Sequence, residues 1–84
     1  RDNMKEVLKF KAVWCGPCKS LSNIMEGTDF GVKVTEVDID EDMATAQKYA
    51  VRGVPTMVLL DEGKEVSRLV GVHQLDKIQK WIEG

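Results

Sequence analysis

Long apolar segments are missing from this sequence. None of the apolar runs in its 84 residues approaches the roughly 18 residues that a membrane-spanning helix needs, so we expect no membrane partner. A basic start followed by an apolar stretch is missing as well, and we therefore expect no signal peptide. Met4 is a candidate native start, and we interpret the residues before it, Arg1–Asn3, as a tag or as disordered.

A dominant charge of either sign is also missing. The chain has 12 basic and 14 acidic residues, which are interspersed, and its formal net charge is −2. Such a balance provides neither the basic field that binds nucleic acid nor an acidic tail, so we expect no nucleic-acid partner. The apolar share of 43% and the charged share of 31% are ordinary for a globular chain. The length fits a single domain over residues 1–84.

Cysteine and histidine are scarce. The sequence has two cysteines, Cys15 and Cys18, and one histidine, His73. Small secreted domains held by disulfides are rich in cysteine, and a bridge between such close positions removes little entropy from the unfolded chain. A purely structural disulfide is therefore the weaker interpretation. Zinc needs about four ligands, and besides the two thiols this chain offers only His73 and carboxylates. We therefore predict no metal site within one chain. A dimer that shares zinc through four thiols stays an alternative.

The sequence does contain one concentrated motif, Trp-Cys-Gly-Pro-Cys at residues 14–18. An apolar segment over 7–13 precedes it and predicts a strand. Apolar residues at helical spacing follow it and predict a helix from about Pro17 to Glu26, ended by Gly27. The thiols therefore lie where a strand ends and a helix begins. There the unpaired amides and the positive end of the helix dipole favour a thiolate.

The remainder of the chain alternates strands and helices. Apolar patterning predicts three more strands, over 32–39, 56–60 and 65–70. Two more helices are predicted over later parts of the chain. The acidic residues 40–42 supply the cap and first turn of one, which ends before Gly53, and the other covers 75–82. The order βαβαββα begins with a unit that needs a parallel strand pair, and a hairpin follows before the last helix. We therefore predict an α/β fold with a four-stranded mixed sheet flanked by helices.

The spacing of the thiols assigns them different roles. Side chains three apart on a helix lie on one face, so Cys15 and Cys18 can form a disulfide without large backbone movement. At the mouth of the helix the pKa of the Cys15 thiol is expected to fall from about 8.5 towards 7 or below. Cys18, one turn inside, is expected to be more buried and less acidic. Cys15 would then attack a substrate disulfide and Cys18 would displace the product, with Gly16 admitting a partner backbone and Pro17 stiffening the turn.

Three motifs in the same order resemble the thioredoxin family. They are Trp-Cys-Gly-Pro-Cys-Lys at 14–19, Arg-Gly-Val-Pro-Thr at 52–56 and Val-Gly at 70–71, and together they cover nearly the whole chain. The resemblance implies a thioredoxin fold and a disulfide reductase with Cys15 as nucleophile and Cys18 as resolving cysteine. It implies electron transport without a cofactor other than that redox-active disulfide. It further implies a cytoplasmic monomer that acts on protein disulfides and is recycled by a thioredoxin reductase or a similar donor.

The resemblance also implies a substrate groove beside the thiols. Pro55 is expected to follow a cis peptide bond and to face the dithiol, which places Val54 in the groove. Gly71 and Val72 would line the other side. Trp14 is either a core aromatic or a flat shield next to the nucleophile, and its position in the motif favours the shield.

Two features depart from the family pattern. Thioredoxins usually begin with an additional strand and helix, so this chain resembles a shortened thioredoxin. They also place a buried Asp six residues before the first cysteine and often a Lys on the neighbouring strand, where this chain has Lys9 and Glu36. Our hypothesis is that Glu36, with Lys9 beside it, handles the proton of Cys18. The alternative is that Lys9 and Lys11 point into water on an uncovered sheet face.

Two other functions compete with disulfide reduction. In the first, the fold is an accessory binding subunit whose dithiol is idle. In the second, the thiols carry a metal. The Gly-Pro pair between the cysteines resembles the reducing members of the family, whereas oxidising members tend to carry His there, so we favour the reductase.

Overall fold

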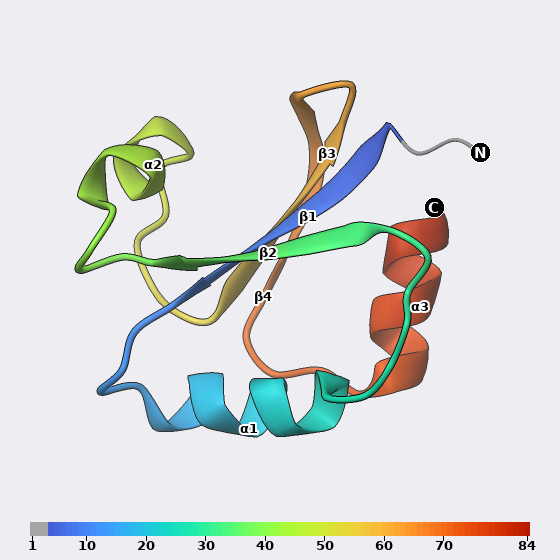
Figure 1. The fold of residues 1–84 in the computed structure, drawn as a ribbon, viewed down its shortest axis with the longest axis horizontal. Coiled ribbons are helices and arrows are strands. Elements are labelled where there is room, and N and C mark those ends of the chain that lie inside the picture. Colours follow the sequence, from blue (N-terminus) through green and yellow to red (C-terminus); the bar gives the residue numbers. More distant parts are fainter. Residues whose placement is uncertain (1–3) are drawn as a thin grey trace.

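A computed structural model describes residues 4–84, and the prediction made for Arg1–Asn3 lies outside that range. The elements follow the predicted order and are labelled in Figure 1: β1 (Lys5–Lys11), α1 (Gly16–Met25), β2 (Lys33–Asp38), α2 (Met43–Lys48), β3 (Thr56–Asp61), β4 (Lys64–Val70) and α3 (Leu75–Glu83).

Most element ends lie within one residue of the prediction, and two elements differ by more. The first strand begins at Lys5 rather than Val7. The first strand ends at Lys11 rather than Val13, because the backbone amide of Cys15 bonds the carbonyl oxygen of Ala12 at 3.2 Å and turns the chain away from the sheet. The second helix ends at Lys48 rather than just before Gly53, since Ala50 takes a φ of 54°, which a helix cannot continue through.

The four strands form one mixed sheet in the order β2-β1-β3-β4. β1 runs parallel to β2 and antiparallel to β3, and β3 and β4 form the predicted hairpin. The predicted fold class is confirmed. Antiparallel pairing sets the last residues of β1 beside the first residues of β3, with Phe10 opposite Thr56. The segments beyond them, 12–15 and 53–55, therefore emerge at the same end of the sheet.

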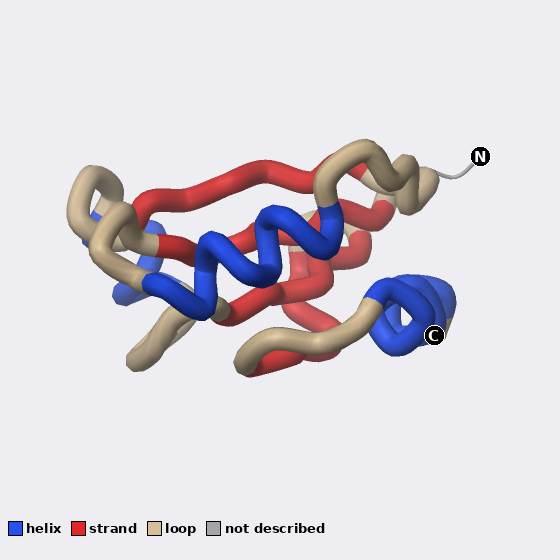
Figure 2. Tube along the Cα trace, turned by 90° about the horizontal axis from the view of Figure 1, so that it is seen from below, coloured by secondary structure: helices blue, strands red, loops and turns tan. Residues whose placement is uncertain are grey.

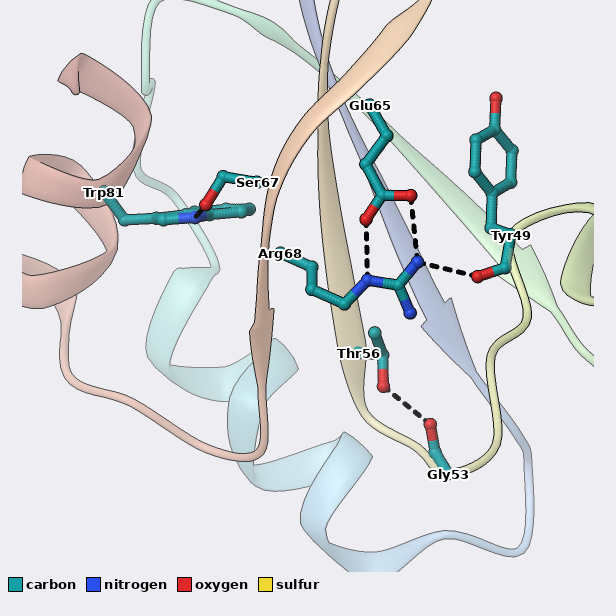
Figure 3. Close-up of polar contacts among 7 residues, drawn as sticks. All are labelled: Tyr49, Gly53, Thr56, Glu65, Ser67, Arg68 and Trp81. Carbon is teal, nitrogen blue, oxygen red and sulfur yellow. Dashed lines mark hydrogen bonds and ion pairs between the residues drawn. The ribbon is translucent and has the colours of Figure 1, made fainter.

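Each face of the sheet carries its own apolar core, because successive strand residues point to opposite faces. On one face Val7 and Met57 pack against α1 and α3, and on the other Leu8 and Val58 pack against α2. Figure 2 shows α1 running across the strands. At the edge, Trp81 of α3 donates its indole N–H to the hydroxyl of Ser67 on β4 at 2.9 Å (Figure 3).

Candidate active site

Cys15 occupies the N-cap position of α1. Its backbone is extended, with φ −92° and ψ 111°, and its sulfur accepts a hydrogen bond from the backbone N–H of Cys18 at 3.1 Å. A residue at this position normally offers an oxygen to the first helical amides; here the cap atom is sulfur. Pro17 fits the first turn because its missing N–H has no partner to lose there. An anion on Cys15 is therefore favoured by an amide and by the helix dipole.

The two cysteines are joined as a disulfide in the structure, with their Cα atoms 5.3 Å apart. That separation lies within the range that a disulfide spans without backbone distortion. The helical spacing therefore gives a pair that can cycle between dithiol and disulfide.

The predicted difference in burial between the two thiols is wrong for this oxidised pair. Cys15 is 4% exposed and Cys18 is 3% exposed, so neither is the more accessible. Both pack with Ala12 in a small apolar cluster that Ile39 and Val54 cover from neighbouring segments. Local spacing could not predict this, because the covering side chains come from the residue just after β2 and from the segment before β3.

The segment before β3 faces the dithiol. The carbonyl oxygen of Val54 lies 3.7 Å from the sulfur of Cys15, the Val54–Pro55 peptide bond is cis, and Pro55 is fully buried. The carbonyl oxygen of Pro55 accepts a hydrogen bond from the backbone N–H of Gly71 at 2.9 Å. Val72 follows directly and is partly exposed. The structure thus brings Val54, Pro55 and Gly71 together beside Cys15.

Trp14 lies on the surface next to Cys15, with 67% of its area exposed. Its indole N–H donates to a carboxylate oxygen of Asp40 at 2.8 Å. The sequence suggested only a helix-capping role for the acidic residues 40–42. Asp42 alone is the N-cap of α2, and its bonds to the hydroxyl and amide of Thr45 hold the pKa of its carboxyl below the usual value. Asp40 instead fixes the indole beside the thiols.

The comparisons with known proteins agree with this geometry. The Thioredoxin family model matches residues 1–84. The chain belongs to the thioredoxin family. It is 38% identical over 79 residues to the thioredoxin of Chlamydia caviae, covering 90% of this chain and 78% of that protein. It is 33% identical over 86 residues to the thioredoxin of Rickettsia bellii, covering 98% of this chain and 82% of that one.

Solved structures of thioredoxins share the fold. A mutant thioredoxin from Halobacterium salinarum superposes with a TM-score of 0.85 at 41% identity, over 98% of this chain and 74% of that one. Thioredoxin from Nicotiana alata superposes with a TM-score of 0.86 at 37% identity, over 99% of this chain and 74% of that one. With its Cys15–Cys18 pair, this thioredoxin-family chain is a dithiol–disulfide oxidoreductase.

The position that usually holds a buried Asp in the family is Lys9, and it is buried here too. Lys9 is 3% exposed, and its ammonium donates to the hydroxyl of Ser22 at 2.6 Å and to a carboxylate oxygen of Glu36 at 3.3 Å. The alternative that Lys9 points into water is therefore wrong, because α1 covers this part of β1. Lys11 is partly exposed and lies 3.6 Å from the other oxygen of Glu36.

Ser22 is the residue of this cluster that sequence reasoning missed. It lies one helical turn after Cys18, and both side chains line the same surface hollow. The four-residue spacing in the sequence was the available signal. Ser22 therefore connects the face of α1 that bears Cys18 to the buried ammonium of Lys9, which in turn bonds the half-exposed carboxylate of Glu36.

Within the part of the chain that the structure describes, no helix is long and apolar enough to span a membrane. No group of three or more His, Cys, Asp and Glu side chains among residues 4–84 is placed to hold a metal ion.

Gly71 and Gly53 give a matched pair of substitutions beside the dithiol. Gly71 has a φ of 92°, in the region that L side chains rarely adopt, whereas Gly53 does not, and a Cβ at either position meets open space. We expect Gly71→Ala to lower the free energy of unfolding by about 1 kcal/mol or more through backbone strain, and Gly53→Ala to leave it equal or slightly higher. Urea denaturation measures both. Equal midpoints for the two variants would contradict the strain argument.

Proposed function

We propose that this chain reduces disulfide bonds of other proteins through a mixed disulfide on Cys15. The Cys15 thiolate attacks one sulfur of the substrate disulfide, a new S–S bond forms, and the other substrate sulfur leaves as a thiolate that takes up a proton. The Cys18 thiolate then attacks the sulfur of Cys15. The substrate departs with two thiols, and the chain is left with the Cys15–Cys18 disulfide.

One observation carries this proposal: the sulfur of Cys15 caps α1 and accepts the backbone N–H of Cys18 at 3.1 Å. The same amide that stabilises the attacking anion belongs to the residue that resolves the intermediate. The two sulfurs therefore need no rearrangement of the helix to exchange partners.

The substrate groove proposed beside Cys15 is formed by Val54, Gly71 and Val72, with Trp14 on its outer side. The main chain of Val54 lies against the attacking sulfur, and Trp14 and Val72 present exposed apolar surface. Exposed apolar side chains that form a patch are typical of surfaces that bind partner proteins. Gly16 and Pro17, both exposed at the helix start, leave room for an incoming backbone.

The remaining parts of the proposal concern the cycle. We propose that the Cys15–Cys18 disulfide is the only redox group and that a thioredoxin reductase or a similar donor returns it to the dithiol. We further propose that the chain works as a cytoplasmic monomer. Membership of the thioredoxin family supports these proposals.

The trapping experiment tests the proposed function directly. Cys18→Ser removes the resolving thiol and leaves its backbone N–H in place, so we expect Cys15 to hold substrate proteins as stable mixed disulfides that dithiothreitol releases. Cys15→Ser is the matched control and should trap nothing. The wild-type protein should speed the dithiothreitol-driven reduction of insulin. Insulin turnover at background rate, with no trapped proteins, would favour the accessory binding subunit instead.

We also propose that Glu36, acting with Lys9, handles the proton of Cys18. Lys9 bonds both Glu36 and Ser22, and Ser22 lies one turn from Cys18. In this scheme the carboxylate of Glu36 is the base, and the ammonium of Lys9 and the hydroxyl of Ser22 connect it to the side of α1 that bears the resolving thiol.

Replacing Glu36 with Gln tests whether Glu36 acts as a base for Cys18 or only as a nearby negative charge. Loss of a base should slow the resolution of the mixed disulfide by about a hundredfold or more. Loss of a charge alone should lower the pKa of the Cys18 thiol and leave resolution equal or faster. Single-turnover kinetics gives the rate, and Glu26→Gln, an exposed carboxylate at the end of α1, is the control. A rate in Glu36→Gln that equals the control rules the relay out.

A further inference from the structure

The segment that presents Val54 to Cys15 is a loop of residues 49–55, between α2 and β3. Its backbone is bonded at several points. The amide of Val51 donates to the carbonyl oxygen of Ala46 at 2.9 Å, near the end of α2. At the other end, the buried hydroxyl of Thr56 donates to the carbonyl oxygen of Gly53 at 2.7 Å (Figure 3). These bonds come from neighbours in the sequence. Two other sets of contacts come from the rest of the fold: Tyr49, Val51 and Val54 pack against the α2-side core, and at the end of the loop the backbone N–H of Gly71 bonds the carbonyl oxygen of Pro55.

Arg68 of β4 supplies a side-chain hydrogen bond to the start of the loop. One guanidinium nitrogen, Nη2, donates to the backbone carbonyl oxygen of Tyr49 at 2.7 Å, across 19 positions of sequence. Figure 3 shows the side chain reaching from β4 over the sheet to the start of the loop. Arg68 is opposite Val58 in the hairpin, and Val58 belongs to the α2-side core. The guanidinium therefore ties the loop to the strand at the edge of the sheet.

A β-bulge makes this geometry possible. The pairing of β3 with β4 shifts between Leu59 and Leu60, so that Leu59 is opposite Ser67 but Leu60 is opposite Glu65, and Val66 is the extra residue. Residues three apart in a regular strand point to opposite faces. The extra residue puts Glu65 and Arg68 on the same face, where they form a two-pronged pair at 2.7 and 2.9 Å.

The pair holds the guanidinium in one plane. Two parallel N–H···O bonds to a carboxylate are stronger and more directional than a single contact. The bonds from Arg68 hold the pKa of the Glu65 carboxyl below its usual value, and those from Glu65 raise the pKa of Arg68. Both groups are therefore charged at neutral pH. With Nε and Nη2 fixed by Glu65, Nη2 is aimed at the Tyr49 oxygen.

We propose that Arg68 and Glu65 form a clamp that positions the loop 49–55, and with it the Val54 main chain, for binding disulfide-bonded protein substrates. Arg68 is a positioning residue here: it acts through Tyr49 and the loop and does not touch the thiols. The inference rests on the proposed function, because it assigns a role in the groove beside Cys15. It adds a determinant of protein-substrate binding that lies on β4 and contacts the start of the loop, whereas Cys15 lies beside Val54 near its end.

The same strand provides a matched control. Ser67, the neighbour of Arg68 on β4, accepts the indole N–H of Trp81 on the other face of the sheet (Figure 3). Ser67→Ala removes a hydrogen bond from β4 without touching the loop. Arg68→Gln removes the clamp. Arg68→Lys keeps the charge and the apolar stem but loses the two-pronged contact, and it replaces the Gln variant if that one fails to fold.

The experiment combines amide hydrogen exchange with kinetics. We expect the hydrogen-bonded loop amides of Ala50 and Val51 to exchange about fivefold or more faster in Arg68→Gln and Arg68→Lys, and at the wild-type rate in Ser67→Ala. The KM for insulin should rise by a similar factor, while reduction of a small aromatic disulfide, which needs Cys15 but little of the groove, stays within about twofold of wild type.

Each outcome decides the inference. Wild-type exchange in both Arg68 variants, or equal acceleration in Ser67→Ala, shows that no clamp holds the loop. Faster exchange with an unchanged KM for insulin shows that the clamp has no role in substrate binding. If the wild-type protein itself does not reduce insulin, the proposed function fails, and the role in binding fails with it. The exchange rates then still show separately whether the clamp exists.

Discussion

The hydrogen bond from the backbone N–H of Cys18 to the sulfur of Cys15 is the constraint on which the site depends. It exists because a strand ends, the chain turns at Ala12, and a helix begins at the next residue after the first cysteine. The residues on either side of the first cysteine, Trp14, Gly16 and Pro17, carry no charge. Backbone dipoles at the start of α1 therefore act directly on the Cys15 sulfur, and they need no reorganisation when charge develops on it.

The sheet supplies the second part of the site. An antiparallel neighbour on one side of β1 brings the start of β3 to the end where the cysteines emerge, and the Val54–Pro55 segment follows. The hairpin then returns β4 to the same end, where the amide of Gly71 meets the carbonyl oxygen of Pro55. Strand order and direction therefore bring three segments that are distant in sequence to the end of the sheet where Cys15 lies: the turn before α1, the Val54–Pro55 segment and the residues that follow β4.

Much of this arrangement was predictable from local pattern. Alternation and helical spacing gave every element in order, and the position of Cys15 at a helix start followed from the residues on either side of it. The same local pattern left two interpretations open for Lys9, a place beside Glu36 or a place in solvent, and the structure shows the first. A lysine on a strand suggests solvent, and its burial depends on Ser22 of α1 and on Glu36 of β2, neither of which is near it in sequence.

Contacts between distant segments account for the other failures. The burial of Cys15 depends on Ile39 and Val54, and the bond from Trp14 to Asp40 spans 26 positions. The bulge that pairs Glu65 with Arg68 leaves no mark in the alternation of β4, because Val66 is apolar and exposed. Patterns with a period of two or of about four residues describe one element at a time, so partners between elements need the fold itself.

The most direct measurement is the titration of the Cys15 thiol in the reduced Cys18→Ser variant, followed by the ultraviolet absorbance of the thiolate. Burial raises the pKa of a thiol, and a capping amide with the helix dipole lowers it. The account predicts that the second effect wins, with a Cys15 pKa near 7 or below. A pKa of about 8.5 or higher, the value of an ordinary or simply buried thiol, would contradict it.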